Sequence, residues 1–177
     1  MLPYGRGGAP PGKGGFSMGK GGKIVVAVTV VAVAVFFYAF VSAQLSATLV
    51  STVVDLADTR QSTFDAMAQA LERGDLADVQ FAELSGDAQD YAFVTYTVQL
   101  EGLNLFPAEW AVLSLTPAEG DVVIIQGTPQ DVSSFGQGQV TATLLTRRDQ
   151  VQAQRHMWVE YYVLGRAHSA VVSGAQS

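Results

Sequence analysis

The chain has 177 residues, no cysteine and a formal net charge of −6 at pH 7. The charge is uneven: the first 23 residues hold four basic residues and no acidic one, and the six basic and sixteen acidic residues that follow give the rest a net charge of −10. We expect no nucleic-acid partner, because binding to phosphates needs surface cations that displace counterions. The lack of cysteine excludes disulfides, thiolate nucleophiles and cysteine-ligated zinc.

Residues 1–23 are predicted to form a disordered, Gly/Lys-rich tail. They hold nine of the 18 glycines and three of the six prolines. A segment of this composition buries too little apolar surface to offset the entropy lost on ordering. The basic residues of the tail, Arg6, Lys13, Lys20 and Lys23, favour the cytoplasmic side of a membrane.

Residues 24–43 are predicted to form a transmembrane helix. The residues from Ile24 to Val41 carry no charge, and as a helix this run would be about 27 Å long, close to the thickness of the hydrocarbon layer. The charges of the tail predict a single-pass protein of the cell membrane with a cytoplasmic N-terminus and an extracytoplasmic C-terminus. An alternative stays open, because Val41-Ser42-Ala43 resembles a signal-peptide cleavage site and cleavage near Ala43 would give a secreted domain.

Residues 44–74 are predicted to continue as an amphipathic helical stem. Apolar residues recur at spacings of four or three, interrupted only by Arg60: Leu45, Leu49, Val53, Leu56, Phe64, Met67 and Leu71. This stripe predicts either packing against the following domain or a membrane-proximal coiled coil through which copies self-associate. The helix can also break near Asp58-Thr59, where either residue would cap a shorter helix running to Arg73.

Residues 75–166 are predicted to form an extracytoplasmic antiparallel β-sandwich. Apolar and polar residues alternate, most clearly over residues 91–103. Further strands are expected at residues 78–84, 110–115, 122–126, 140–144 and 157–163, with turn residues between them. About six to seven short strands of this kind favour an immunoglobulin-like sandwich. Residues 167–177 are small and polar and are expected to form a flexible C-terminal tail.

Part of this pattern resembles the small immunoglobulin-like sandwiches of bacterial surface proteins. The resemblance is carried by a polar turn at Asn104, by Pro107-Ala108-Glu109-Trp110, and by a Gly-Gln-Gly turn at 136–138 before the strand at 140–145. Over residues 90–165 the chain is similar to CARDB-type adhesion-related modules and to water-stress (LEA-2-like) sandwiches. The resemblance implies a domain that binds or scaffolds and has no shared catalytic residues.

A second resemblance is to type IV pilin-like subunits, in which a long N-terminal helix precedes a β-rich head. Gly15-Phe16-Ser17-Met18 is similar to their processing site. The chain departs from that pattern, because no glutamate follows at the required place and the residues up to Lys23 separate the site from the apolar run. The resemblance implies, as an alternative function, a structural filament subunit.

Three aromatic residues are candidates for binding a partner. Trp158 and Tyr162 fall on one face of a predicted strand, two residues to either side of Glu160, and with Trp110 they would form an aromatic patch. The alternative is that the second sheet or a helix over residues 59–73 covers this face.

No set of residues predicts catalysis, a metal site or a cofactor site. The only histidines, His156 and His168, are twelve residues apart and have no carboxylate at a fixed spacing. Arg147, Arg148 and Arg155 surround one predicted turn and are expected on the surface, paired with nearby acidic residues.

Together these patterns predict an α+β membrane protein, in which one transmembrane helix continues into a helical stem and then into a β-sandwich. The expected function is that of a non-enzymatic, membrane-anchored extracytoplasmic binding or scaffolding protein. Its expected partner, besides the bilayer around residues 24–43, is a protein or a cell-wall component.

Overall fold

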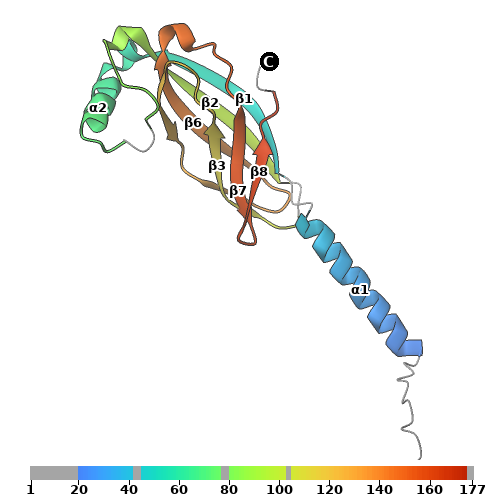
Figure 1. The fold of residues 1–177 in the computed structure, drawn as a ribbon. Helices are drawn as coiled ribbons and strands as arrows, with labels where there is room; N and C mark the ends of the chain where they lie inside the picture. The colour runs from blue at the N-terminus through green and yellow to red at the C-terminus, as the bar shows by residue number, and fades with distance from the viewer. Residues whose placement is uncertain (1–19, 42–44, 77–79, 103–104, 175–177) are drawn as a thin grey trace, which may run out of the picture. The chain divides into compact units, whose positions relative to one another are not determined.

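The computed structural model of the chain describes residues 20–41, 45–76, 80–102 and 105–174, except for the side chains of residues 20, 22, 23 and 39–41. The described residues fall into two units, one up to residue 38 and one from residue 39, and each is described by itself. Figure 1 gives the order of their elements.

The first helix, α1 (Lys20–Val41), has 22 residues and begins before the predicted start at Ile24. Its side chains from Ile24 to Tyr38 are exposed, and the Thr29 hydroxyl donates a hydrogen bond to the Val25 carbonyl at 2.9 Å, so it does not need another partner. Among the residues described, no helix is both long enough and apolar enough to cross a membrane. Residues 1–19 of the predicted disordered tail lie outside the described residues. Residues 20–23, which were predicted to belong to this tail, form the start of α1.

The second unit contains two four-stranded antiparallel sheets, as predicted for a β-sandwich. The first sheet has the strand order β1-β2-β6-β4 and the second has the order β5-β3-β7-β8. The strands of the first sheet are β1 (Leu45–Leu56), β2 (Tyr91–Gly102), β6 (Gln137–Arg147) and β4 (Asp121–Gln126). Those of the second are β5 (Gln130–Val132), β3 (Ala108–Leu115), β7 (Met157–Val163) and β8 (Arg166–Val171).

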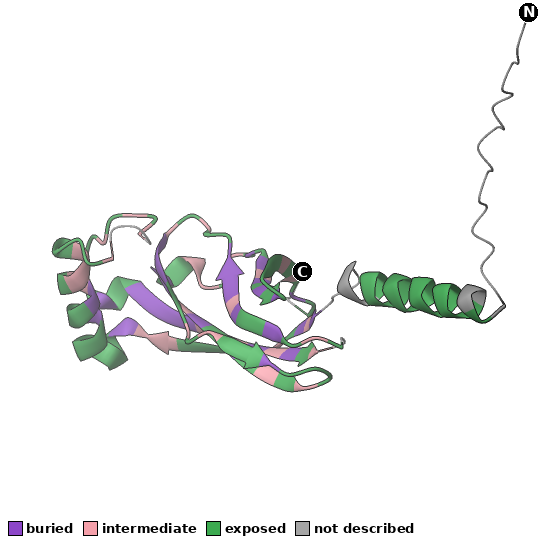
Figure 2. Ribbon diagram, turned by 90° about the horizontal axis from the view of Figure 1, so that it is seen from below, coloured by how far each residue is buried: buried purple, intermediate pink, exposed green. Residues whose placement is uncertain are grey.

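The main core lies between the two sheets. Alternation along β2 directs Val94, Val98 and Leu100 inward, where they pack with Leu113 of β3 and Val159 of β7. Each of these five side chains is fully buried. The period-2 pattern seen in the sequence is therefore the inward face of each strand. Figure 2 shows the buried residues concentrated on the strands.

A second core lies on the outer face of the first sheet, under α2 (Gln61–Glu72). Phe64 and Met67 of this helix pack against Tyr91 and Phe93 of β2 and against Leu145 of β6. The first four residues of β2 are consequently buried on both faces, whereas its later residues alternate between buried and half-buried. The helix thus covers one end of the first sheet and makes the unit three-layered there.

The predicted helical stem over residues 44–74 is wrong in its first half. Residues 45–56 form β1, which pairs with β2 along its length apart from a bulge between Leu49 and Ser51. An apolar spacing of four, as from Leu45 to Leu49 to Val53, satisfies a period of 2 as well as one of 3.6, and the β-branched content of the segment favours the strand. The structure therefore has no helix at residues 45–56 through which copies of the chain could self-associate.

The shorter helix predicted in the second half of this segment is confirmed, but its predicted caps are wrong. A 3₁₀ turn, η1 (Ala57–Arg60), precedes α2, and no side chain caps the start of α2. The Thr59 hydroxyl instead donates to the Leu56 carbonyl at 2.6 Å, which ties the turn to the end of β1.

Three further boundaries differ from the sequence prediction. The strand expected at residues 78–84 is reduced, within the described residues, to one bridge between Gln80 and Val123. The C-terminal tail expected at residues 167–177 forms most of β8, because the backbone from Arg166 to Val171 pairs with β7 in antiparallel register. The sandwich therefore begins at Leu45 and has eight strands, whereas the sequence predicted a start at residue 75 and six to seven strands. Residues 175–177 lie outside the description.

Candidate functional site

The outer face of the second sheet carries the three predicted aromatic residues, and two of them, Trp110 and Tyr162, line the same hollows. Alternation along β7 buries Met157, Val159, Tyr161 and Val163 and turns the intervening residues outward. Tyr162 therefore keeps 44% of its surface exposed. The expected alternative, in which this face is covered, is wrong at this end, because α2 packs on the other sheet.

Trp110 reaches the same face through an irregularity in β3. The register of β3 against β7 shifts between Glu109 and Val112, so both Glu109 and Trp110 are exposed. Trp110 has a φ of 55°, a left-handed conformation that costs a bulky residue of the order of 1–3 kcal/mol. The Asp131 carboxylate accepts a hydrogen bond from the Trp110 backbone N–H at 2.8 Å and holds this conformation. The indole is 63% exposed as a result.

We call Trp110 and Tyr162 together the aromatic ridge, because both residues line two hollows on this face. The first hollow, of about 540 Å³, is lined by Glu109, Asp131 and Gly165 as well as the ridge. The second, of about 440 Å³, is lined by the ridge and by residues that include Glu160, His168 and Ser169. No lysine or arginine lines either hollow.

Trp158, the third predicted residue, is not part of the ridge. It lies on the same face of β7 but lines neither hollow. Its indole N–H donates to Glu160 Oε1 at 2.8 Å, and its ring centroid is 5.9 Å from that of His156. Trp158 therefore orients the carboxylate that borders the second hollow.

His168, on β8, packs against an aromatic ring of the core. Its ring stacks on Tyr161 with the centroids 5.6 Å apart, and among the described residues its buried Nε2 has no hydrogen-bond partner. The Tyr161 hydroxyl accepts a bond from the Leu45 backbone N–H at 3.2 Å. Burial raises the pKa of Tyr161, outweighing the opposite effect of this hydrogen bond.

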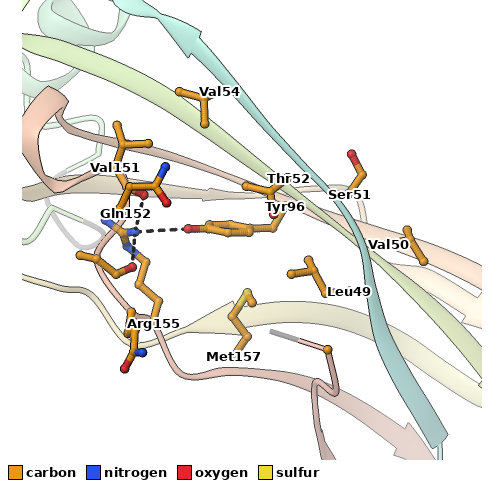
Figure 3. A pocket seen from close by; sticks show the side chains of 13 residues that line it. Leu49, Val50, Ser51, Thr52, Val54, Tyr96, Val151, Gln152, Arg155 and Met157 are labelled. Atoms are coloured by element: carbon orange, nitrogen blue, oxygen red, sulfur yellow. Dashed lines mark hydrogen bonds between the residues drawn. The ribbon is translucent and has the colours of Figure 1, made fainter. Parts of the chain in front are cut away.

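A separate groove, which the sequence did not predict, opens at the edge of the sandwich beside β1. It has a volume of about 470 Å³ and lies between the second half of β1 and the loop at residues 151–155 (Figure 3). Ser173 pairs with the backbone of β1 around Thr48 and covers this edge of the strand at that point. Farther along, Val54 lies opposite Val94 and so faces the interior by register, yet it remains 43% exposed.

The inner end of this groove is a buried ion pair, which corrects the expectation that Arg155 is a surface residue. The guanidinium donates to Asp121 from Nε at 2.9 Å and from Nη2 at 2.6 Å, and both side chains are almost fully buried. Figure 3 shows the Tyr96 hydroxyl directed at the same guanidinium, at 3.2 Å.

Backbone carbonyls complete the coordination of Arg155. Those of Gln150 and Ala153 accept bonds at 3.0 and 2.9 Å. Burial acts to lower the pKa of Arg155, but the hydrogen bonds and negative charge of Asp121 outweigh it and raise the pKa above its ordinary value. Because the guanidinium is already saturated with acceptors, it ties the loop to the sheet and is not available to an anionic ligand.

A scan against models of known protein families and a search of curated proteins found no match to this chain. The similarity to adhesion-related and water-stress sandwiches therefore stays a prediction from the sequence. The geometry of the aromatic ridge and its hollows is the basis for a function.

Proposed function

We propose that this chain is a membrane-anchored, extracytoplasmic binding or scaffolding protein without enzymatic activity, with an immunoglobulin-like sandwich as its binding domain. The observation that carries the proposal is the aromatic ridge. A tryptophan held exposed in a strained conformation, next to a second exposed ring, is typical of a recognition surface, because aromatic residues contribute most of the binding free energy in many interfaces.

The anchor is proposed from the sequence of α1 and of the tail before it. The run from Ile24 to Val41 has no charge, and four basic residues with no acid precede it. As a helix this uncharged run would be about 27 Å long, close to the thickness of a hydrocarbon layer, so the anchor is proposed from the sequence pattern alone. The basic tail then favours the cytoplasm, which puts the sandwich on the other side.

A reporter enzyme that is active only outside the cytoplasm, fused after Ser177, should be active, and the purified chain should begin at Met1. Activity of a cytoplasm-specific reporter at the same position would contradict the topology. The mature N-terminus separates the alternatives: a start near Phe16 would support a pilin-like filament subunit, and a start at Gln44 would support a secreted domain.

Replacing both ridge residues, Trp110→Ala with Tyr162→Ala, should weaken binding to an envelope partner by at least about tenfold, because the two rings supply most of the exposed aromatic surface of this face. The measurement is capture of cross-linked partners by the full chain from envelope preparations. The matched control is Phe81→Ala with Leu105→Ala, which removes two exposed apolar side chains away from the ridge. Equal loss in both variants, or retention in the ridge variant, would contradict the proposal.

A further inference from the structure

We propose that the two hollows beside the aromatic ridge bind the ammonium or guanidinium groups of a basic segment of a partner polypeptide. This inference rests on the proposed binding function and adds the chemistry of the partner. Its basis is the combination of exposed ring faces and unpaired carboxylates around the same two spaces.

The ridge supplies the aromatic half of a cation site. A Trp or Tyr ring attracts a cation that lies over its face, and the attraction grows as water is excluded from the contact. Trp110 and Tyr162 each line both hollows, so a cation in either hollow meets both residues.

The carboxylates supply the electrostatic half. Glu109 and Asp131 line the first hollow and Glu160 lines the second. None of the ion pairs found among the described residues, Arg60–Asp55, Arg73–Asp75 and Arg155–Asp121, involves any of these three acids.

Hydrogen bonds hold two of these carboxylates in place without neutralising them. One oxygen of Asp131 accepts the Trp110 backbone N–H, and one oxygen of Glu160 accepts the Trp158 indole N–H. The other oxygen of each group can then receive a cation. Because the donors are neutral, the negative charge at each hollow is retained.

Two hollows on one ridge fit a ligand with more than one positive charge. Basic side chains projecting from one polypeptide can enter both hollows while the chain between them crosses the ridge. The net charge of −10 that follows the first 23 residues draws such a segment toward the domain from a distance. Charge complementarity therefore selects a basic partner over a neutral or acidic one.

The test uses the full chain in a non-ionic detergent with Trp158→Phe, which leaves Trp110 as the only tryptophan, so that its fluorescence reports on the ridge. Hexalysine should change the emission of Trp110 saturably at low salt, whereas hexalysine acetylated on its side chains should not. Removing the three charges with Glu109→Gln, Asp131→Asn and Glu160→Gln should weaken hexalysine binding by about tenfold or more relative to the Trp158→Phe parent, in which the indole donor to Glu160 is already absent. The amide oxygen introduced by Asp131→Asn can still accept the bond from the Trp110 backbone N–H.

The matched control removes three exposed acids elsewhere, with Asp58→Asn, Glu119→Gln and Asp149→Asn, so that the net charge changes by the same amount. Its affinity should stay within about twofold of that of the parent. Equal weakening by the control would overturn the inference, since net charge alone would then explain binding. A Trp110 emission that does not respond to hexalysine would also overturn it. Partner capture that still depends on the ridge would then leave the proposed binding function standing with a ligand of another class.

Discussion

Replacing Arg155 by methionine should lower the free energy of unfolding by about 3–5 kcal/mol. The substitution leaves the Asp121 carboxylate buried with no counter-charge, and it removes the donors to the Gln150 and Ala153 carbonyls. Urea unfolding followed by tryptophan fluorescence measures the loss, because neither tryptophan belongs to this network.

The double variant Arg155→Met with Asp121→Leu should be more stable than Arg155→Met alone. It removes the unpaired charge together with its partner, and an apolar pair of similar size costs little in a buried site. The control is Arg60→Met, which breaks an exposed ion pair with Asp55 and should cost at most about 1 kcal/mol. If Arg155→Met and Arg60→Met lower the free energy of unfolding by the same amount, the buried ion pair does not stabilise this end of the sandwich as its contacts imply.

The Arg155 network also shows where the sequence stops being informative. The alternation of β7 predicted that Trp158 and Tyr162 share one face, and the structure shows that Tyr162 is exposed on it. Asp121 and Arg155 are 34 positions apart, and no local sequence pattern links the two residues. The one available signal was that Asp121 directly precedes the apolar run Val122–Ile125, which places a carboxylate against a core strand.

Only the residue types of the aromatic ridge could be predicted from the sequence, because its contacts also join distant parts of the chain. Residue type made Trp110 and Tyr162 candidates for partner binding, but only the pairing of β3 with β7 brings the two residues together. The bulge that turns Trp110 outward depends on Asp131 of a third strand, β5, which no local pattern links to it. The strand β1 was missed because a spacing of four fits two periods, and a choice between them requires the partner strand.

Phe93→Ala should lower the free energy of unfolding by about 3–5 kcal/mol, through the second core and not through the core between the sheets. Phe93 is fully buried and packs with Phe64, Tyr91 and Leu145 beneath α2. The cavity left by the ring would face the helix, which is held to the sheet by few side chains. Hydrogen exchange should therefore accelerate in α2 more than in β7, which belongs to the other core.

Phe81→Ala is the matched control, because it removes the same ring from a position that is 50% exposed, and it should cost less than about 1 kcal/mol. Leu144→Ala is the complementary change, since Leu144 is fully buried between the sheets and its loss should increase exchange in β7 as well. Uniform acceleration across α2 and β7 in Phe93→Ala would contradict the separation of the two cores. Separate responses would show that α2 can loosen while the second sheet, which carries the aromatic ridge, keeps its structure.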